Sequence, residues 1–133
     1  MKEVQVRIFD KQIYPTHSDE AENTFSGNLA IKDDDIFITY KDKSTGINTI
    51  IKAYKTGVSV KRMGTMNGRL KFEVDKPYRT LYGTPYWEIP IEIQTSKSDI
   101  YLLEKGIKIY IEYKILMDCE KVSDNIFMIV ANW

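Results

Sequence analysis

The sequence offers few residues that could carry out acid–base or nucleophilic chemistry. His17 is the one histidine, and histidine is the side chain that most readily exchanges protons near neutral pH or ligates haem iron. Cys119 is the one cysteine, and a catalytic thiol needs an activating base beside it. Neither residue stands in a recognised motif with a partner. We therefore interpret His17 as a surface loop residue and Cys119 as a turn residue, and we expect no catalytic residues and no enzyme activity.

The carboxylates do not form a recognisable metal-binding pattern either. A zinc site with four Cys or His ligands needs more of them than His17 and Cys119 provide. The acidic run Asp33 to Asp35 is consecutive, whereas a calcium loop spaces its carboxylates at alternate positions and ends in a glutamate. Three aspartates between two strands favour a hairpin turn instead. We expect neither a metal ion nor a cofactor.

Arg62 is the charged residue with the most informative position. It alternates in register with Val58 and Val60, so its guanidinium is predicted to point to the same side as the core. A buried guanidinium needs a partner, which could be a glutamate, a tyrosine hydroxyl or the anionic head of a ligand. Because Arg62 ends its strand near Gly64, its side chain could instead reach solvent at the mouth of a barrel. The sequence leaves both readings open.

Other polar residues share the predicted core face, and one segment gathers aromatic rings. The hydroxyls of Tyr40, Thr49, Thr95 and Tyr113 would suit either a semi-polar cavity or a filled core. The segment 81–87 contains a glycine and a proline that shape a corner, which would be an aromatic ligand platform or a plug at one barrel end. The candidate ligand-binding residues are Arg62, Tyr40, Tyr82, Tyr86, Trp87 and Tyr113.

The elements that must position these residues are β-strands. Apolar residues recur at every second position, most clearly in Ile107–Ile115, and this period places them on one face of a half-buried strand. About nine or ten such runs alternate with short turns rich in Gly, Pro, Asp, Asn and Ser. The strands are predicted at 4–8, 25–31, 36–40, 47–53, 58–62, 70–74, 87–93, 100–103, 107–115 and 126–130, with turns that include 96–98 and the longest irregular segment at 11–19.

This pattern predicts a single all-β domain spanning residues 1–133, a closed or nearly closed antiparallel barrel of about 8 to 10 strands. A barrel is favoured over a sandwich because closure removes the exposed edges of strands rich in Ile and Val. Pro90 within a strand indicates a bulge or an edge there.

Charge and composition bound the location and the partners. The chain has 19 basic and 19 acidic residues, but the segment 52–79 holds eight basic residues against two acidic ones. This excess is explained either by cross-strand pairing with acidic neighbours or by a surface for nucleic acid or an acidic protein. The N-terminal residues 1–10 are too charged for a signal peptide, and one cysteine fits a reducing compartment. We expect a cytoplasmic protein that does not associate with membranes.

Several local motifs resemble a known family. The resemblance is carried by Gly27 after an acidic lead-in, Ile38-Thr39-Tyr40, Lys61-Arg62-Met63-Gly64, Leu70-Lys71-Phe72, Tyr82-Gly83-Thr84-Pro85-Tyr86 and Ile111-Glu112-Tyr113. With these motifs the chain resembles the YwiB-like family of small bacterial proteins of unknown function. It departs from the family at Trp87, where the family usually continues with glycine. The resemblance implies a lipocalin-like calycin barrel, and through that fold, ligand binding by analogy alone.

The function expected from the sequence is binding of a small hydrophobic or amphipathic ligand, with an acidic group facing Arg62. The alternative is an interaction module that uses the basic 52–79 surface to bind nucleic acid or an acidic protein, although the balanced net charge argues against nucleic acid. The oligomeric state stays open, a homodimer included.

Overall fold

The computed structural model describes residues 1–65, 67–83 and 88–133, except for the side chains of residues 82 and 83. The described residues form ten strands: β1 (Lys2–Ile13), β2 (Ser18–Lys32), β3 (Asp35–Asp42), β4 (Ile47–Tyr54), β5 (Gly57–Met63), β6 (Gly68–Phe72), β7 (Tyr78–Gly83), β8 (Glu88–Leu103), β9 (Gly106–Met117) and β10 (Glu120–Asn132). Among these residues there is no helix with the length and apolarity that crossing a membrane requires.

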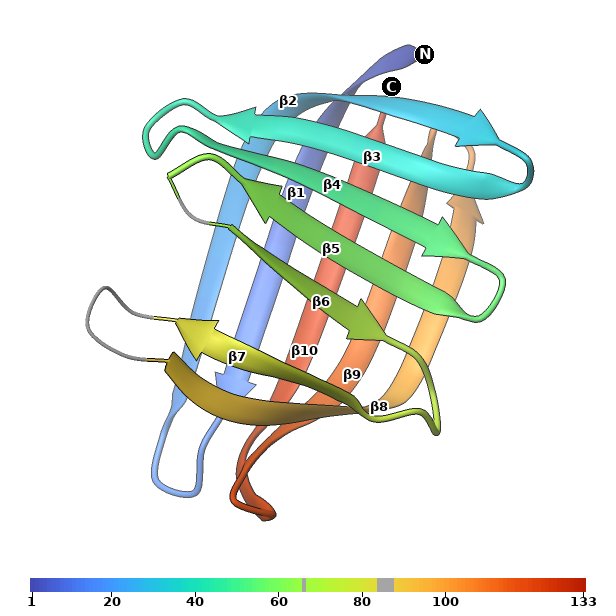
Figure 1. Cartoon of the computed structure of the whole chain (residues 1–133). Coiled ribbons are helices and arrows are strands. Elements are labelled where there is room, and N and C mark those ends of the chain that lie inside the picture. The colour runs from blue at the N-terminus through green and yellow to red at the C-terminus, as the bar shows by residue number, and fades with distance from the viewer. Residues whose placement is uncertain (66, 84–87) are drawn as a thin grey trace.

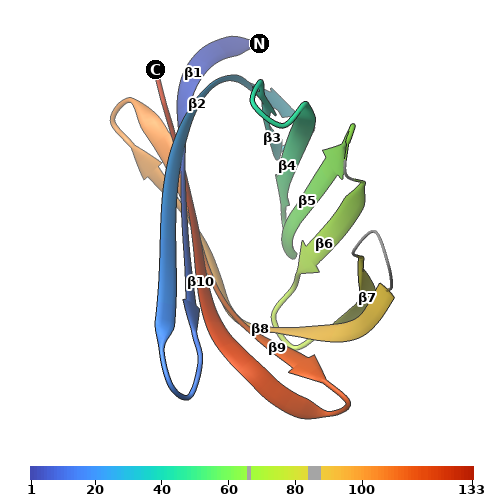
Figure 2. The same ribbon diagram turned by 90° about the vertical axis from the view of Figure 1, so that its left-hand side faces the viewer.

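All ten strands belong to one antiparallel sheet that curls into a nearly closed barrel. The hydrogen-bonded order is β6-β5-β4-β3-β2-β1-β10-β9-β8-β7, so the first and last strands are neighbours in the middle of the sheet. Figures 1 and 2 show how the sheet folds over until its two ends, β6 and β7, face each other. The barrel prediction is therefore confirmed, with a seam between β6 and β7 in place of a final ladder.

The inward faces follow the period-two pattern. Val6, Ile38, Ile51, Ile109 and Ile129 come from five different strands and are all fully buried in one core. Phe72 lies in the same core, with its ring centroid 4.8 Å from that of Tyr113 and 6.1 Å from that of Phe127. A chain of this length can bury a continuous core from alternating strands alone.

Glycine permits the close contact of strands where β2 changes neighbours. Residues 18–26 of β2 pair only with β1, whereas Gly27 pairs with both Val4 of β1 and Tyr40 of β3. At this point β2 bends from one side of the barrel toward the other (Figure 1). A Cβ atom at Gly27 would collide with the backbone oxygen of Thr39.

Two sequence predictions of irregular structure are wrong. The segment 11–19 is mostly strand, because β1 and β2 pair as far as Ile13 and Ser18 and leave only a tight turn between them. The turn predicted at 96–98 does not exist, since β8 runs straight through it with a β-bulge between Thr95 and Lys97. A bulge inserts one unpaired residue into a strand without ending it, and a short polar run there has the composition of a turn.

The seam also accounts for two errors about β6 and β7. Strand β7, which the alternation did not predict, is an edge strand that pairs only with the first part of β8. Val74, predicted to face the core, is 44% exposed because β6 ends at Phe72. Pro90 lies where β8 pairs with β7 but has not yet begun to pair with β9, so the edge position expected for it is confirmed.

Candidate functional site

The interior of the barrel holds two hollows that meet at Asp10 and Arg62. The larger one has a volume of about 340 Å³ and the smaller one about 220 Å³, and both are lined by these two side chains. Asp10 continues the inward face of Val4, Val6 and Ile8 on β1. Arg62 ends the inward face of β5 and pairs across the backbone with Thr49 of β4. The two charges thus come from strands that are far apart in the sheet.

The larger hollow is apolar except at this end and beside the seam. Its aliphatic and aromatic walls come from strands β5 to β10: Val60, Leu70, Leu81, Ile91, Ile93, Ile115 and Phe127. Gly68 and Arg69 on β6 and Thr80 on β7 line it on the seam side, so the hollow reaches the gap between these two strands. An apolar cavity with a few convergent polar groups is the usual form of a small-molecule site.

The polar end of this hollow is electrostatically unusual. Burial raises the pKa of Asp10 above its usual value, and the Arg62 guanidinium opposes this effect only in part. Oδ1 of Asp10 is shielded from solvent and has no hydrogen-bond partner among the described residues. An unpaired buried acceptor costs free energy. Asp10 therefore carries an unsatisfied acceptor beside the hollow that its side chain lines together with Arg62.

Two tyrosines complete the surroundings of the charged pair. Tyr113 on β9 is 7% exposed, and burial, with Asp10 as a second cause, raises the pKa of its hydroxyl so that it stays protonated. Tyr40 on β3 lines the smaller hollow, stacks on Phe25 at 4.5 Å, and has its pKa raised by burial. Both phenols can donate and accept hydrogen bonds. They add adaptable polar groups on either side of the two charges.

The structure brings together three of the six residues that the sequence singled out. Tyr40, Arg62 and Tyr113 line the hollows. Arg62 is half-buried, so it is neither enclosed in the core nor fully open to solvent at the barrel mouth. The side chain of Tyr82 and the whole of Tyr86 and Trp87 lie outside the described residues.

Asp10 was not among the residues that the sequence singled out. A signal for it was present, because Asp10 has the same parity as Val4, Val6 and Ile8, which were predicted to face the core. Thr49 and Thr95, also predicted on the inward face, are 3% and 7% exposed, and Oγ1 of Thr95 has no partner among the described residues.

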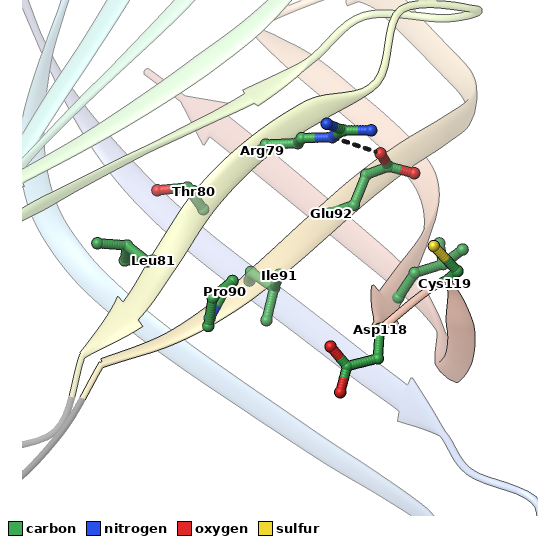
Figure 3. Close-up of a pocket in the computed structure, with 9 residues that line it drawn as sticks. Arg79, Thr80, Leu81, Pro90, Ile91, Glu92, Asp118 and Cys119 are labelled. Atoms are coloured by element: carbon green, nitrogen blue, oxygen red, sulfur yellow. Dashed lines mark hydrogen bonds and ion pairs between the residues drawn. The ribbon is translucent and has the colours of Figure 1, made fainter.

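A third hollow, of about 460 Å³, lies where β8 separates from the β9–β10 turn (Figure 3). Nε of Arg79 donates to Glu92 at 3.0 Å there, and the Cys119 thiol is exposed in the turn, where the backbone of Asp118 and Cys119 has positive φ. Because the residues of this groove are mostly exposed, it does not enclose a ligand as the interior does.

The other residues considered for chemistry occupy turns. In the β1–β2 turn, Nδ1 of the exposed His17 lies 3.0 Å from Thr16 Oγ1, and its Nε2 lies 3.8 Å from Asp19 at the start of β2. The aspartates at 33 and 34 have positive φ in the β2–β3 turn, as expected for a hairpin. Within the described ranges, no group of three or more His, Cys, Asp or Glu side chains is arranged to hold a metal ion.

The unsatisfied carboxylate predicts that Asp10→Asn stabilises the fold at neutral pH. The folded-state pKa of Asp10 is raised, so ionisation costs more in the folded than in the unfolded chain at pH values above it. The expected rise in Tm is a few degrees, because the carboxyl is partly exposed and screened. The gain should shrink as the pH falls through the raised pKa toward the ordinary value of 3.8, where both states bind the proton.

Thermal unfolding monitored by circular dichroism between pH 4 and pH 8 would measure this gain. Asp124→Asn is the matched control, since Asp124 lies near the surface and is paired with Lys121 at 2.9 Å. A loss of Tm in Asp10→Asn at pH 8, or a gain that does not depend on pH, would contradict the assignment of Asp10 as a destabilised buried charge.

The fold and this interior together define a nearly closed, ten-stranded antiparallel β-barrel with a cavity. A family model described as "Domain of unknown function (DUF1934)" matches residues 6–129. The chain belongs to this family, whose description assigns no activity.

A search of solved structures confirms the fold. The chain is similar to the crystal structure of the ywiB protein from Bacillus subtilis, with a TM-score of 0.84 and 16% sequence identity over 98% of this chain and 91% of that chain. The resemblance to the YwiB-like family is thus confirmed, and at this identity the likeness establishes the fold alone. No curated protein matches the sequence.

Proposed function

We propose that this protein binds a small, largely apolar molecule inside the barrel, with the polar head of the ligand at Arg62 and Asp10. The observation that supports it is the interior hollow of about 340 Å³, with apolar walls and a polar end. This volume is at the lower end of the range of small-molecule sites. On this proposal the protein is a cytoplasmic, non-enzymatic barrel of the lipocalin-like type that the family resemblance implies.

The seam between β6 and β7 supports the proposal because it provides a route of entry. Strand β6 pairs with β5 on one side and strand β7 with β8, and the two are joined through the short connection 73–77. Gly68, Leu70 and Leu81 of these strands all line the larger hollow. A ligand entering between the strands would pass Gly68, Arg69 and Thr80 at the seam, with Arg62 beside Gly68 on β5 and the apolar walls beyond.

Bulk added inside this entrance is predicted to block the ligand. Leu70→Trp replaces an aliphatic side chain at the mouth of the hollow with a bulky indole ring. The neighbouring Lys71→Trp places the same ring on the opposite face of β6. With the uncharged dye N-phenyl-1-naphthylamine as the probe, fluorescence titration should show at least tenfold weaker binding to Leu70→Trp than to Lys71→Trp. Tm values of both variants check that the barrel remains folded.

Native mass spectrometry of the protein purified from its own cells is the complementary measurement. A small-molecule adduct that disappears on denaturation and is absent from Arg62→Ala is the expected result. Equal binding of the probe to Leu70→Trp and Lys71→Trp, or no binding of probe and no adduct in the natural protein, would refute an interior ligand site.

A second candidate function uses the basic outer surface of residues 52–79. Lys61 and Arg69 lie directly opposite each other on β5 and β6, and like charges at such positions repel unless a partner neutralises them. Against this, Lys52 and Arg79 each pair with an acidic residue on a neighbouring strand, as expected for ordinary cross-strand chemistry, and Lys76 pairs with Glu73 within the connection 73–77. A salt-sensitive shift of RNA or DNA that Lys61→Glu abolishes would favour this function over the first.

A further inference from the structure

The charges at the polar end of the larger hollow limit the head group that it can hold. Asp10 and Arg62 line the same space, so a ligand that reaches one of them also lies in the field of the other. At effective dielectric constants near 20, two unit charges 4 Å apart still interact by about 4 kcal/mol. The net charge of the head group therefore decides the fit.

A charged head group of either sign is penalised at this position. A carboxylate would be attracted by Arg62 but repelled by the Asp10 carboxylate, and an ammonium group would meet the reverse pattern. Arg62 offers donors only, whereas an ionised Asp10 offers acceptors only. Oδ1 of Asp10 is shielded and has no partner among the described residues, and the half-buried Asp10 side chain as a whole borders the hollow. A matching head must therefore donate to Asp10 and accept from Arg62.

We propose that the cavity selects an uncharged head group that carries a hydrogen-bond donor beside an acceptor, that is, an amide or lactam on a small apolar body. This rests on the proposed function and specifies its ligand class. The amide N–H₂ donates to the carboxylate of Asp10, and the amide oxygen accepts from the guanidinium of Arg62. The Tyr113 hydroxyl, at the same end of the hollow, can take part in either sense.

Three probes with the same tail test this selection: octanamide, octanoate and octylamine. Isothermal titration calorimetry at neutral pH should show that the natural protein binds octanamide at least tenfold more tightly than either charged probe. Asp10→Asn removes the negative charge, so the affinity for octanoate should increase most and should exceed the affinity for octylamine by a wide margin. Arg62→Gln removes the positive charge, so the affinity for octylamine should increase most. Asp124→Asn, at the exposed Lys121 pair, should leave the order unchanged.

The outcomes separate the two proposals. If octanoate or octylamine binds the natural protein as tightly as octanamide, or if Asp10→Asn and Arg62→Gln do not shift the order in opposite directions, the assigned head group is wrong although the cavity binds ligands. If none of the three probes and no N-phenyl-1-naphthylamine binds, the interior is not a ligand site and both proposals fail. Unchanged far-ultraviolet circular dichroism of each variant verifies that the binding data refer to folded barrels.

Discussion

Phe72→Ala is expected to remove about 3–5 kcal/mol from the free energy of unfolding. Phe72 is fully buried, and its ring packs on those of Tyr113 and Phe127. These partners belong to β9 and β10, on the wall opposite β6, so the ring joins the two sides of the barrel near the seam. Truncation leaves a cavity that strands on opposite sides cannot easily fill. Since small domains are stable by only about 5–15 kcal/mol, much of the stability is at stake.

Guanidinium chloride unfolding measures this loss directly, and Phe37→Ala is its matched control. Phe37 is the same residue type on β3, but it alternates with the buried Ile38, so it lies on the outer face near Lys52. The control should lose about 1 kcal/mol or less. Equal losses in the two variants would mean that Phe72 does not anchor the core as its burial indicates.

Gly27→Ala is expected to cost about 3 kcal/mol, at the upper end of the usual cost of overpacking. The cause is steric rather than conformational, because Gly27 does not have a positive φ. A Cβ atom there would meet the backbone oxygen of Thr39 and lie 2.9 Å from Cγ2 of Val6. The Thr39 oxygen cannot move without disturbing the ladder between β2 and β3, and the methyl group of Val6 is fully buried and has little room to shift.

Gly68→Ala provides the comparison for this substitution. An added Cβ at Gly68 has nothing within 4 Å, so the same change adds a methyl group in open space. Its free energy of unfolding should change by no more than about 0.5 kcal/mol, with a slight gain from the less flexible unfolded chain. If the two glycine variants unfold at the same denaturant concentration, the close approach at Gly27 is not a constraint on the fold.

The period-two pattern was sufficient to predict which face of most strands is buried. It placed Val4, Val6 and Ile8 inside, along with the alternate residues of Ile107–Tyr113, and the structure buries them all. The same rule put Arg62 on the inner face, because one face of a strand is defined by parity whatever the residue type. Fold class and the location of the charged site therefore follow from local sequence.

Long-range geometry could not be predicted in this way. The bulge after Thr95 changes the register within β8, and a polar run such as 96–98 has the same composition whether the chain turns or bulges. The meeting of Asp10 with Arg62 depends on how far the sheet curls, which no single strand encodes. Asp10 was missed because the predicted strand 4–8 ended before it, whereas β1 continues to Ile13.

The pairing of the first strand with the last has a consequence for how the chain is assembled. As the polypeptide emerges from the ribosome, β1 can join β2 but must wait for the last 13-residue strand before its other edge is covered. Lys2 and Trp133 lie together, with the ammonium nitrogen 4.1 Å from the ring centroid. Joining the ends there and cutting the chain at 73–77 would give a permuted sequence in which every strand is followed by the strand that pairs with it in the sheet. The natural order thus postpones the longest-range contact until β10 has been made, and the permuted order would replace that contact with a hairpin.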